Sequence, residues 1–209
     1  MKQRGNAVFL VMIAIALFAM LAYSFTISDR QKGTIDKENA ALAATEIISF
    51  FPGIKTAILR MLSRGILPAE INFNTTVSGE NVVFAANGGN VFYRPLPPNI
   101  GNATDWGFRD LTDPTNGFYV KDVGSNTNVS GREAFGGVAD ISLAVCQQIN
   151  KALSLPMTPA INSATTGVAT IYAVGTNVLD AYPGKLSACL QSSIASGGVY
   201  LYYHVLIAQ

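Results

Sequence analysis

Apolar and polar positions separate most sharply at the N-terminal end of the chain. Residues 1–5 (MKQRG) carry two cations, whereas residues 6–27 contain no charged side chain. An α-helix rises 1.5 Å per residue, so about 20 apolar residues cross a hydrocarbon layer of about 30 Å. The pattern therefore predicts a membrane-spanning helix over residues 6–27.

A second, amphipathic pattern follows the polar residues 28–33. Gly33 is expected to kink or interrupt the helix, with Thr34 or Asp36 capping a new start. Pro52 and Gly53 are expected to break it again, because proline removes a backbone donor. A further helical piece would then run over residues 54–63 and stop at Gly65. The apolar positions of the main piece fall on one broad face, namely Ile35, Ala41, Leu42, Ile47, Ile48 and Phe51.

From Pro68 onward, short β-rich runs replace the helical period. Residues 82–84 and 91–94 flank an Asn-Gly-Gly-Asn turn at 87–90, which predicts a hairpin. A second hairpin is expected between residues 106–111 and 118–123.

The C-terminal part of the chain predicts one more helix and two more strands. Residues 124–137 are polar and indicate a loop. Apolar residues recur every four positions over 141–155, which predicts a helix with Asp140 as its N-cap. The runs at 167–175 and 199–208 are typical of strands.

These elements predict an α+β protein: a long N-terminal hydrophobic helix followed by a globular head with an antiparallel sheet and a helix. The expected division is residues 1–5 as a leader, 6–65 as a helical stem and 66–209 as the head. The length of 209 residues suits one stem and one head domain.

Three interpretations of the N-terminus are open. A cleaved secretory signal would use the small-x-small triplet Ala22-Tyr23-Ser24, although its apolar region usually spans about 7–15 residues. An uncleaved anchor would keep Lys2 and Arg4 in the cytoplasm and place the remainder of the chain outside. The third interpretation rests on Gly5.

A short basic leader that ends in Gly5 directly before the apolar helix resembles the processing site of type IV prepilins and type II secretion pseudopilins. The resemblance implies cleavage after Gly5 and methylation of the new N-terminus, Asn6. The family usually carries Glu at the fifth mature position, where this chain has Leu10. As partners it implies the membrane, a leader peptidase, assembly machinery and further copies in a helical filament. It places the subunit in the inner membrane before assembly, and in an extracellular or periplasmic filament afterwards.

The two cysteines, Cys146 and Cys189, favour one disulfide in an exported chain, with two separately buried thiols as the alternative. Closing the loop between them would stabilise the fold by roughly 4 kcal/mol in the chain-entropy model. A disulfide across the last part of the head is also a feature of the pilin family.

Composition and motifs argue against several classes of function. Only 13% of residues are charged and the net charge is +1, with no basic patch, so nucleic acid binding is not expected. His204 is the single histidine and is expected to be an ordinary residue of the terminal strand. No nucleophile elbow, phosphate loop or dinucleotide motif is present, so neither catalysis nor a cofactor is expected.

Two further groups of residues have an ordinary and a functional interpretation. The Asx-rich loops at 99–105, 110–116 and 122–128 could bind Ca²⁺, but turn formation is the favoured explanation, and no metal site is expected. Several aromatic residues could line a binding face, but core packing is favoured for most of them. They are Phe92, Tyr93, Trp106, Tyr200, Tyr202 and Tyr203.

The leading functional hypothesis is a structural subunit of a type IV pilus-like or pseudopilus filament that polymerises through its N-terminal helix. The alternative is a membrane-anchored periplasmic or surface binding domain that does not polymerise. An exported enzyme is the third class considered.

Overall fold

The computed structural model describes residues 5–109, 111, 118–124, 133–162, 177–192 and 199–208. Side chains are described at all of these except 5–8, 10, 21–35, 118 and 177. The chain forms two compact units, Met1–Asn39 and Ala40–Gln209. One helix, α1 (Gly5–Ser63), contributes to both units. The expected stem and head domains stay predictions, but by packing the residues of α1 from Ala40 onward belong to the head unit.

The head unit combines helices with a mostly antiparallel five-stranded sheet. Besides α1 it contains α2 (Leu143–Ala152) and a single-turn 3₁₀ helix, Pro68–Glu70. In spatial order, the strands are β1 (Gly107–Arg109), β3 (Ala134–Ile141), β7 (Tyr200–Ile207), β6 (Ser187–Ser192) and β4 (Ile161–Asn162). Only the β4–β6 pair is parallel. The expected combination of a long apolar helix, an antiparallel sheet and a second helix is thus present.

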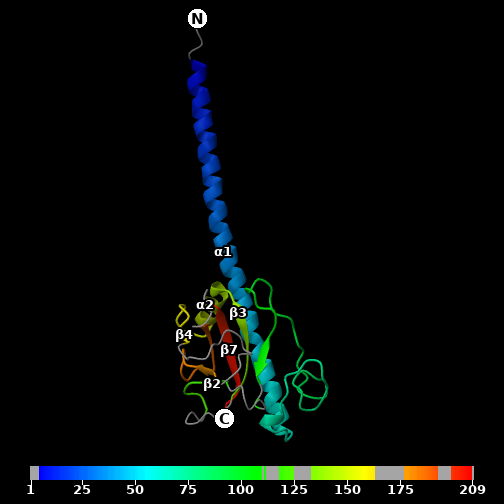
Figure 1. Cartoon of the computed structure of the whole chain (residues 1–209). Helices are drawn as coiled ribbons and strands as arrows, with labels where there is room; N and C mark the ends of the chain where they lie inside the picture. The colour runs from blue at the N-terminus through cyan, green and yellow to red at the C-terminus, as the bar shows by residue number, and fades with distance from the viewer. Residues whose placement is uncertain are drawn as a thin grey trace. The chain divides into compact units, whose positions relative to one another are not determined.

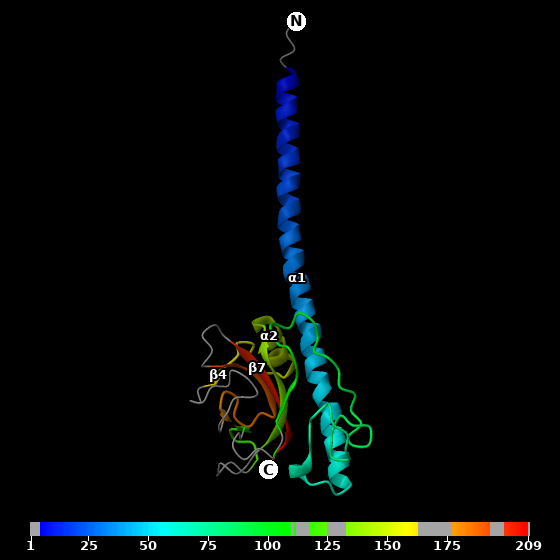
Figure 2. The same ribbon diagram turned by 45° about the vertical axis from the view of Figure 1, so that its right-hand side comes forward.

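A second, two-stranded sheet is formed by β2 (Phe118–Val120) and β5 (Asn177–Leu179), which pair in parallel. Val120 and Leu179 share a buried cluster with Tyr203 of β7. Tyr202, the preceding residue in β7, belongs instead to the cluster that contains Phe51 of α1. Because successive side chains of a strand point to opposite faces, the large sheet is covered by helix on one face and by the small sheet on the other. Figures 1 and 2 show the C-terminal part of α1 alongside the large sheet.

Helix α1 passes through Pro52 without a break, so the prediction of two separate helical pieces is wrong. Proline deprives the carbonyl of residue 48 of its helical donor, at a cost of about 3 kcal/mol. Five side chains on both sides of Pro52 are nevertheless fully buried against the head, and each such burial contributes roughly 1.5–3 kcal/mol. They are Ile47, Phe51, Ile54, Ile58 and Met61. Tertiary packing therefore outweighs the local helix breaker.

The helix is also continuous through Gly33, so the expected interruption and the capping by Thr34 or Asp36 do not occur. Its C-terminus is as predicted. Gly65 has φ of 92°, and the amides of Gly65 and Ile66 donate to the carbonyls of Leu62 and Met61. This is a Schellman motif, and its left-handed position favours glycine.

The hairpin expected at residues 82–94 does not form. The chain instead closes into compact turns, in which the amide of Gly89 donates to the carbonyl of Val82 and that of Val91 to the carbonyl of Val83. A Cβ atom on Gly88 or Gly89 would collide with the Val82 and Val83 carbonyl oxygens. The glycines serve this close backbone approach rather than a two-residue hairpin turn.

The second expected hairpin is also wrong, because its two halves belong to different sheets. β1 pairs with β3, whereas β2 pairs with β5. The expected loop at 124–137 is wrong for its last residues, since β3 begins at Ala134. This strand contains two glycines at 136 and 137, which conceal its β character. The strand expected at 167–175 lies outside the described residues.

The predicted helix at 141–155 and the predicted terminal strand are confirmed as α2 and β7. Ser142, rather than Asp140, caps α2, since its side chain accepts a hydrogen bond from the amide of Val145 at 3.3 Å. Asp140 lies in β3 with φ of 61°, next to an irregularity in the pairing with β7. That backbone conformation belongs to a β-bulge and not to a helix cap.

Candidate functional site

The N-terminal part of α1 presents a continuous apolar surface. Every side chain from Val11 to Met20 is exposed in its unit, and none of these residues is charged. Phe18, for example, is 77% exposed. An apolar helical surface of this kind requires lipid or other protein to cover it.

Gly5, the predicted processing position, is the first described residue of α1. Asn6 is the second helical residue. Residues 1–4 of the predicted leader lie outside the described residues, and the side chains of Asn6 and Leu10 are outside the described set. The predicted processing event stays a prediction.

Among the residues with described side chains, one helical segment is long and apolar enough to cross a membrane, Asp36–Ser63. Its most apolar window has a mean hydropathy of 1.4 and is 44% buried inside the protein. Its buried face packs in the core of the head, which explains its apolar character without a bilayer. Half of the side chains of the expected spanning segment 6–27 lie outside the described set. Within its described part, Val11–Met20 forms a ten-residue apolar helical stretch.

Cys146 and Cys189 form the expected disulfide, which joins α2 to β6 across a Cα–Cα distance of 5.4 Å. Both residues are fully buried. Asn150, one helical turn after Cys146, reinforces this junction: its Oδ1 accepts from the Cys189 amide and its Nδ2 donates to the Cys189 carbonyl, both at 2.8 Å. The role of Asn150 is not predictable from the sequence, because nothing in a helical pattern marks one polar residue as the partner of a distant strand.

His204 lies in β7, as expected. Its ring stacks on Phe51 with centroids 5.2 Å apart, and its Nδ1 lies 3.3 Å from the Tyr202 hydroxyl. Burial, assisted by the positive charge of Lys55, lowers the pKa of His204 to about 4. A neutral imidazole packed against α1 is the environment of a core residue.

The Asx-rich loops are only partly described, and 110–116 and 122–128 fall mostly outside. Within the described residues, no group of three or more His, Cys, Asp or Glu side chains lies close enough to hold a metal ion. In the first loop, Asp105 accepts hydrogen bonds from the Trp106 amide, at 2.8 Å, and from the Tyr93 hydroxyl. These contacts join Asp105 to the following residue and to a tyrosine twelve residues earlier in the chain.

The aromatic residues divide between core and surface. Trp106, Tyr202 and Tyr203 are buried, as core packing predicts. Trp106 packs on Phe50 of α1 at 4.5 Å between ring centroids. Tyr93 and Tyr200 are half-buried, and Phe92 is 84% exposed.

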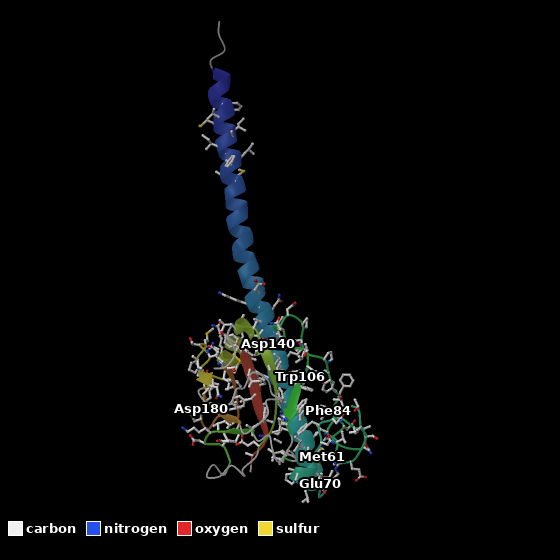
Figure 3. All side chains as sticks on the ribbon, viewed as in Figure 1. Met61, Glu70, Phe84, Trp106, Asp140 and Asp180 are labelled. Carbon is white, nitrogen blue, oxygen red and sulfur yellow. A yellow bond between two sulfur atoms is a disulfide. The ribbon has the colours of Figure 1, made fainter. Side chains whose placement is uncertain are left out.

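A surface pocket of about 460 Å³ opens in the head beside these rings. Its polar wall consists of Asn72, Asn74, Thr75 and Asp105. Its aromatic wall consists of Phe73, Tyr93, Trp106 and Phe108. Figure 3 labels Trp106 and Phe84; the ring of Phe84 supports this wall, 5.1 Å from Tyr93 and 5.4 Å from Phe108. The sequence pointed to Tyr93 and Trp106, and to Asp105 within the loop at 99–105, but not to Phe73 or Phe108.

Comparison of the chain with protein families, curated proteins and solved structures finds no match. What can be inferred about function therefore rests on the residues and on their arrangement.

Proposed function

We propose that this chain is a structural subunit of a type IV pilus-like or pseudopilus filament, which polymerises through its N-terminal hydrophobic helix. The observation that carries the proposal is α1 itself. From Val11 to Met20 it exposes an uncharged apolar surface, while from Ala40 onward it is part of a folded head. A subunit stored in a bilayer and later packed against copies of itself needs both properties.

The proposed assembly begins with the subunit held in the inner membrane by residues 6–27. A leader peptidase removes residues 1–5, and assembly machinery then transfers the helix from lipid into the filament core. The helix exchanges one apolar environment for another, so close packing between helices supplies the net attraction. The filament is extracellular or periplasmic, and the head faces outward.

Exposed apolar side chains on the head are compatible with contacts between subunits. Leu42 and Leu59, both in α1, are 70% and 58% exposed, and Phe92 is 84% exposed. A shallow hollow lined by Pro52, Gly53 and Val91, among others, lies in the same region. Single exposed apolar residues are common on proteins, so they support the proposal only together with the N-terminal helix.

The experiment is intact-mass measurement and N-terminal sequencing of the protein from native membranes and from sheared cell-surface material. Wild-type protein is expected to begin at a methylated Asn6 and to occur in the sheared fraction. Gly5→Arg is expected to remain in the membrane with residues 1–5 attached.

The matched control is Gly53→Arg, which places the same side chain at a helical glycine where an added Cβ meets no neighbouring atom. It should be processed normally. Processing of Gly5→Arg at the wild-type position, or wild-type protein that starts at Met1, would contradict the proposal.

The second candidate is a membrane-anchored binding domain that does not polymerise. Leu10 favours it, because the family's Glu at that position meets the N-terminus of the neighbouring subunit. Protein that begins at Met1 and occurs only in membranes would support this alternative.

A further inference from the structure

The pocket beside Trp106 has the features of a binding site for a small polar ligand. Its volume of about 460 Å³ lies within the range of roughly 300–1,000 Å³ typical of ligand pockets. The exposed residues Asn74, Thr75 and Asp105 lie at its polar wall, while Tyr93 and Phe108 are half-buried.

The polar wall is held in place by its own hydrogen bonds. Asn72 Oδ1 accepts from the Asn74 amide at 2.8 Å, and Asn74 Oδ1 accepts from the amide and the hydroxyl of Thr76, each at 2.8 Å. Within the described residues, the Nδ2 groups of Asn72 and Asn74 and the Thr75 hydroxyl have no hydrogen-bond partner. The wall therefore offers the oriented amide groups of Asn72 and Asn74, together with the Thr75 hydroxyl, as donors to a ligand.

Asp105 adds an acceptor to these donors. Its Oδ1 is engaged by the Trp106 amide and the Tyr93 hydroxyl. Its Oδ2 has no hydrogen-bond partner among the described residues. A ligand with groups that both donate and accept hydrogen bonds, such as hydroxyl groups, could bind the Asp105 acceptor and the amide and hydroxyl donors at the same time.

The rings of the aromatic wall are positioned by contacts with one another. Phe73 and Phe108 stack at 5.2 Å between centroids with an interplanar angle of 6°. Phe84 braces Tyr93 edge-on at 87°. Such a surface suits the C–H face of a ligand whose other groups are polar.

The charged groups that line the pocket indicate which kinds of polar ligand it can bind. No lysine, arginine or histidine is among the described residues that line it, and Asp105 is its single carboxylate. An anionic ligand would meet a negative charge with no cation to offset it. One carboxylate is also too few oxygen ligands for Ca²⁺.

From this combination we infer that the pocket binds a neutral saccharide, with hydroxyl groups on Asn72, Asn74, Thr75 and Asp105 and a ring face on Phe108 and Tyr93. The inference goes beyond filament assembly and does not depend on it, because the pocket lies entirely within the head. For one or two sugar rings, the expected dissociation constant is about 1 mM.

The test is saturation-transfer NMR with the full chain in micelles of an amine oxide detergent, which carries no sugar. The probes are lactose, cellobiose and N,N′-diacetylchitobiose, with tetramethylammonium as a cationic competitor. Transfer to the ring C–H protons of at least one saccharide is expected, and titration should give a millimolar constant.

Asp105→Asn combined with Thr75→Ala should weaken this binding about tenfold or more, because a hydrogen bond to a carboxylate is stronger than one to an amide. Asparagine keeps an oxygen for the Trp106 amide. The matched control is Asn102→Ala, which removes an exposed amide outside the pocket. Thermal midpoints establish that the variants fold.

Two results would overturn the inference. One is no transfer from the wild-type protein to any of the saccharides, including the case in which tetramethylammonium alone binds. The other is equal saccharide binding by the wild type and by the folded double variant, which would locate the interaction elsewhere. Neither result depends on cleavage after Gly5 or on filament formation.

Discussion

At the scale of single residues, Glu133 is the least expected feature of the head. It is only 3% exposed, and its Oε2 accepts a hydrogen bond from the Val120 amide of β2 at 2.7 Å. Burial raises the pKa of Glu133 to about 7, although the hydrogen bond from Val120 opposes the shift. The side chain thus joins the small sheet to the start of β3. When the carboxyl group is ionised, its burial lowers the stability of the folded state.

The free energy of unfolding should depend on pH in a way that reflects the titration of Glu133. The pKa is about 7 in the folded chain against 4.5 as its ordinary value, so the folded state retains a proton between these pH values that the unfolded state has lost. The contribution of Glu133 to stability is therefore full below pH 4.5 and is lost as pH rises to about 7. Glu133→Gln should remove this loss and therefore gain about 3 kcal/mol of unfolding free energy relative to wild type as pH rises from 4.5 to 7. Urea unfolding at several pH values measures it.

The titration of His204 should change the stability of the protein in the opposite direction with pH. Its folded pKa of about 4 lies below its ordinary value of 6.5, so its contribution is present above pH 6.5 and is lost as pH falls towards 4. His204→Gln should flatten the acid side of the stability profile and leave the Glu133 effect in place. A Glu133→Gln profile parallel to that of wild type would show that Glu133 titrates normally.

At the scale of elements, the attachment of α2 to β6 is doubled. The disulfide Cys146–Cys189 supplies one connection and Asn150 the other. The Nδ2 of Asn150 also lies 3.2 Å from the Tyr182 hydroxyl, to which the Ala160 amide donates. A buried amide with every group satisfied fixes the position of the helix along the strand.

Loss of Asn150 should be costly even with the disulfide intact. Asn150→Ala leaves the buried amide and carbonyl of Cys189 without these partners, and we expect a loss of about 2–4 kcal/mol in unfolding free energy. The measurement is chemical denaturation under oxidising conditions. Gln148→Ala, a half-buried position on the same helix, is the control and should change stability by less than about 0.5 kcal/mol. Similar losses in both variants would contradict a special role for Asn150.

At the scale of the whole molecule, the main feature is the exposed apolar surface of the N-terminal unit. Ile13 and Leu17 lie one helical turn apart and are both exposed. The adjoining stretch from residue 6 to 27 contains no charge. Association with a membrane is what this surface favours.

Charges introduced into this surface should release the protein from membranes. Ile13→Arg combined with Leu17→Arg would cost roughly 5–7 kcal/mol of insertion free energy. The variant should move into the soluble fraction on alkaline carbonate extraction. The control is Leu42→Arg with Leu59→Arg, at two exposed positions of the head, which should remain in the pellet. Retention of the N-terminal variant together with the control would show that residues 6–27 do not anchor the chain.

The elements that the sequence predicted correctly are those whose pattern is local. The uncharged apolar run, the four-residue period of α2 and the β-rich terminal strand are each visible within a short window, because helix and strand periods act over adjacent residues. The disulfide was likewise predicted correctly, from the even number of cysteines in a chain whose N-terminus resembles an export signal.

The features that the sequence did not predict are those that depend on contacts between residues far apart in the chain. Helix α1 continues through Pro52 because residues on both sides of the proline are buried in the core of the head. β1 and β2 separate because their partners, β3 and β5, lie elsewhere in the chain. The pocket likewise joins residues 72–75 to Tyr93 and Asp105. Local residue preferences contribute a few tenths to about 1 kcal/mol each, and burial of several large side chains outweighs them.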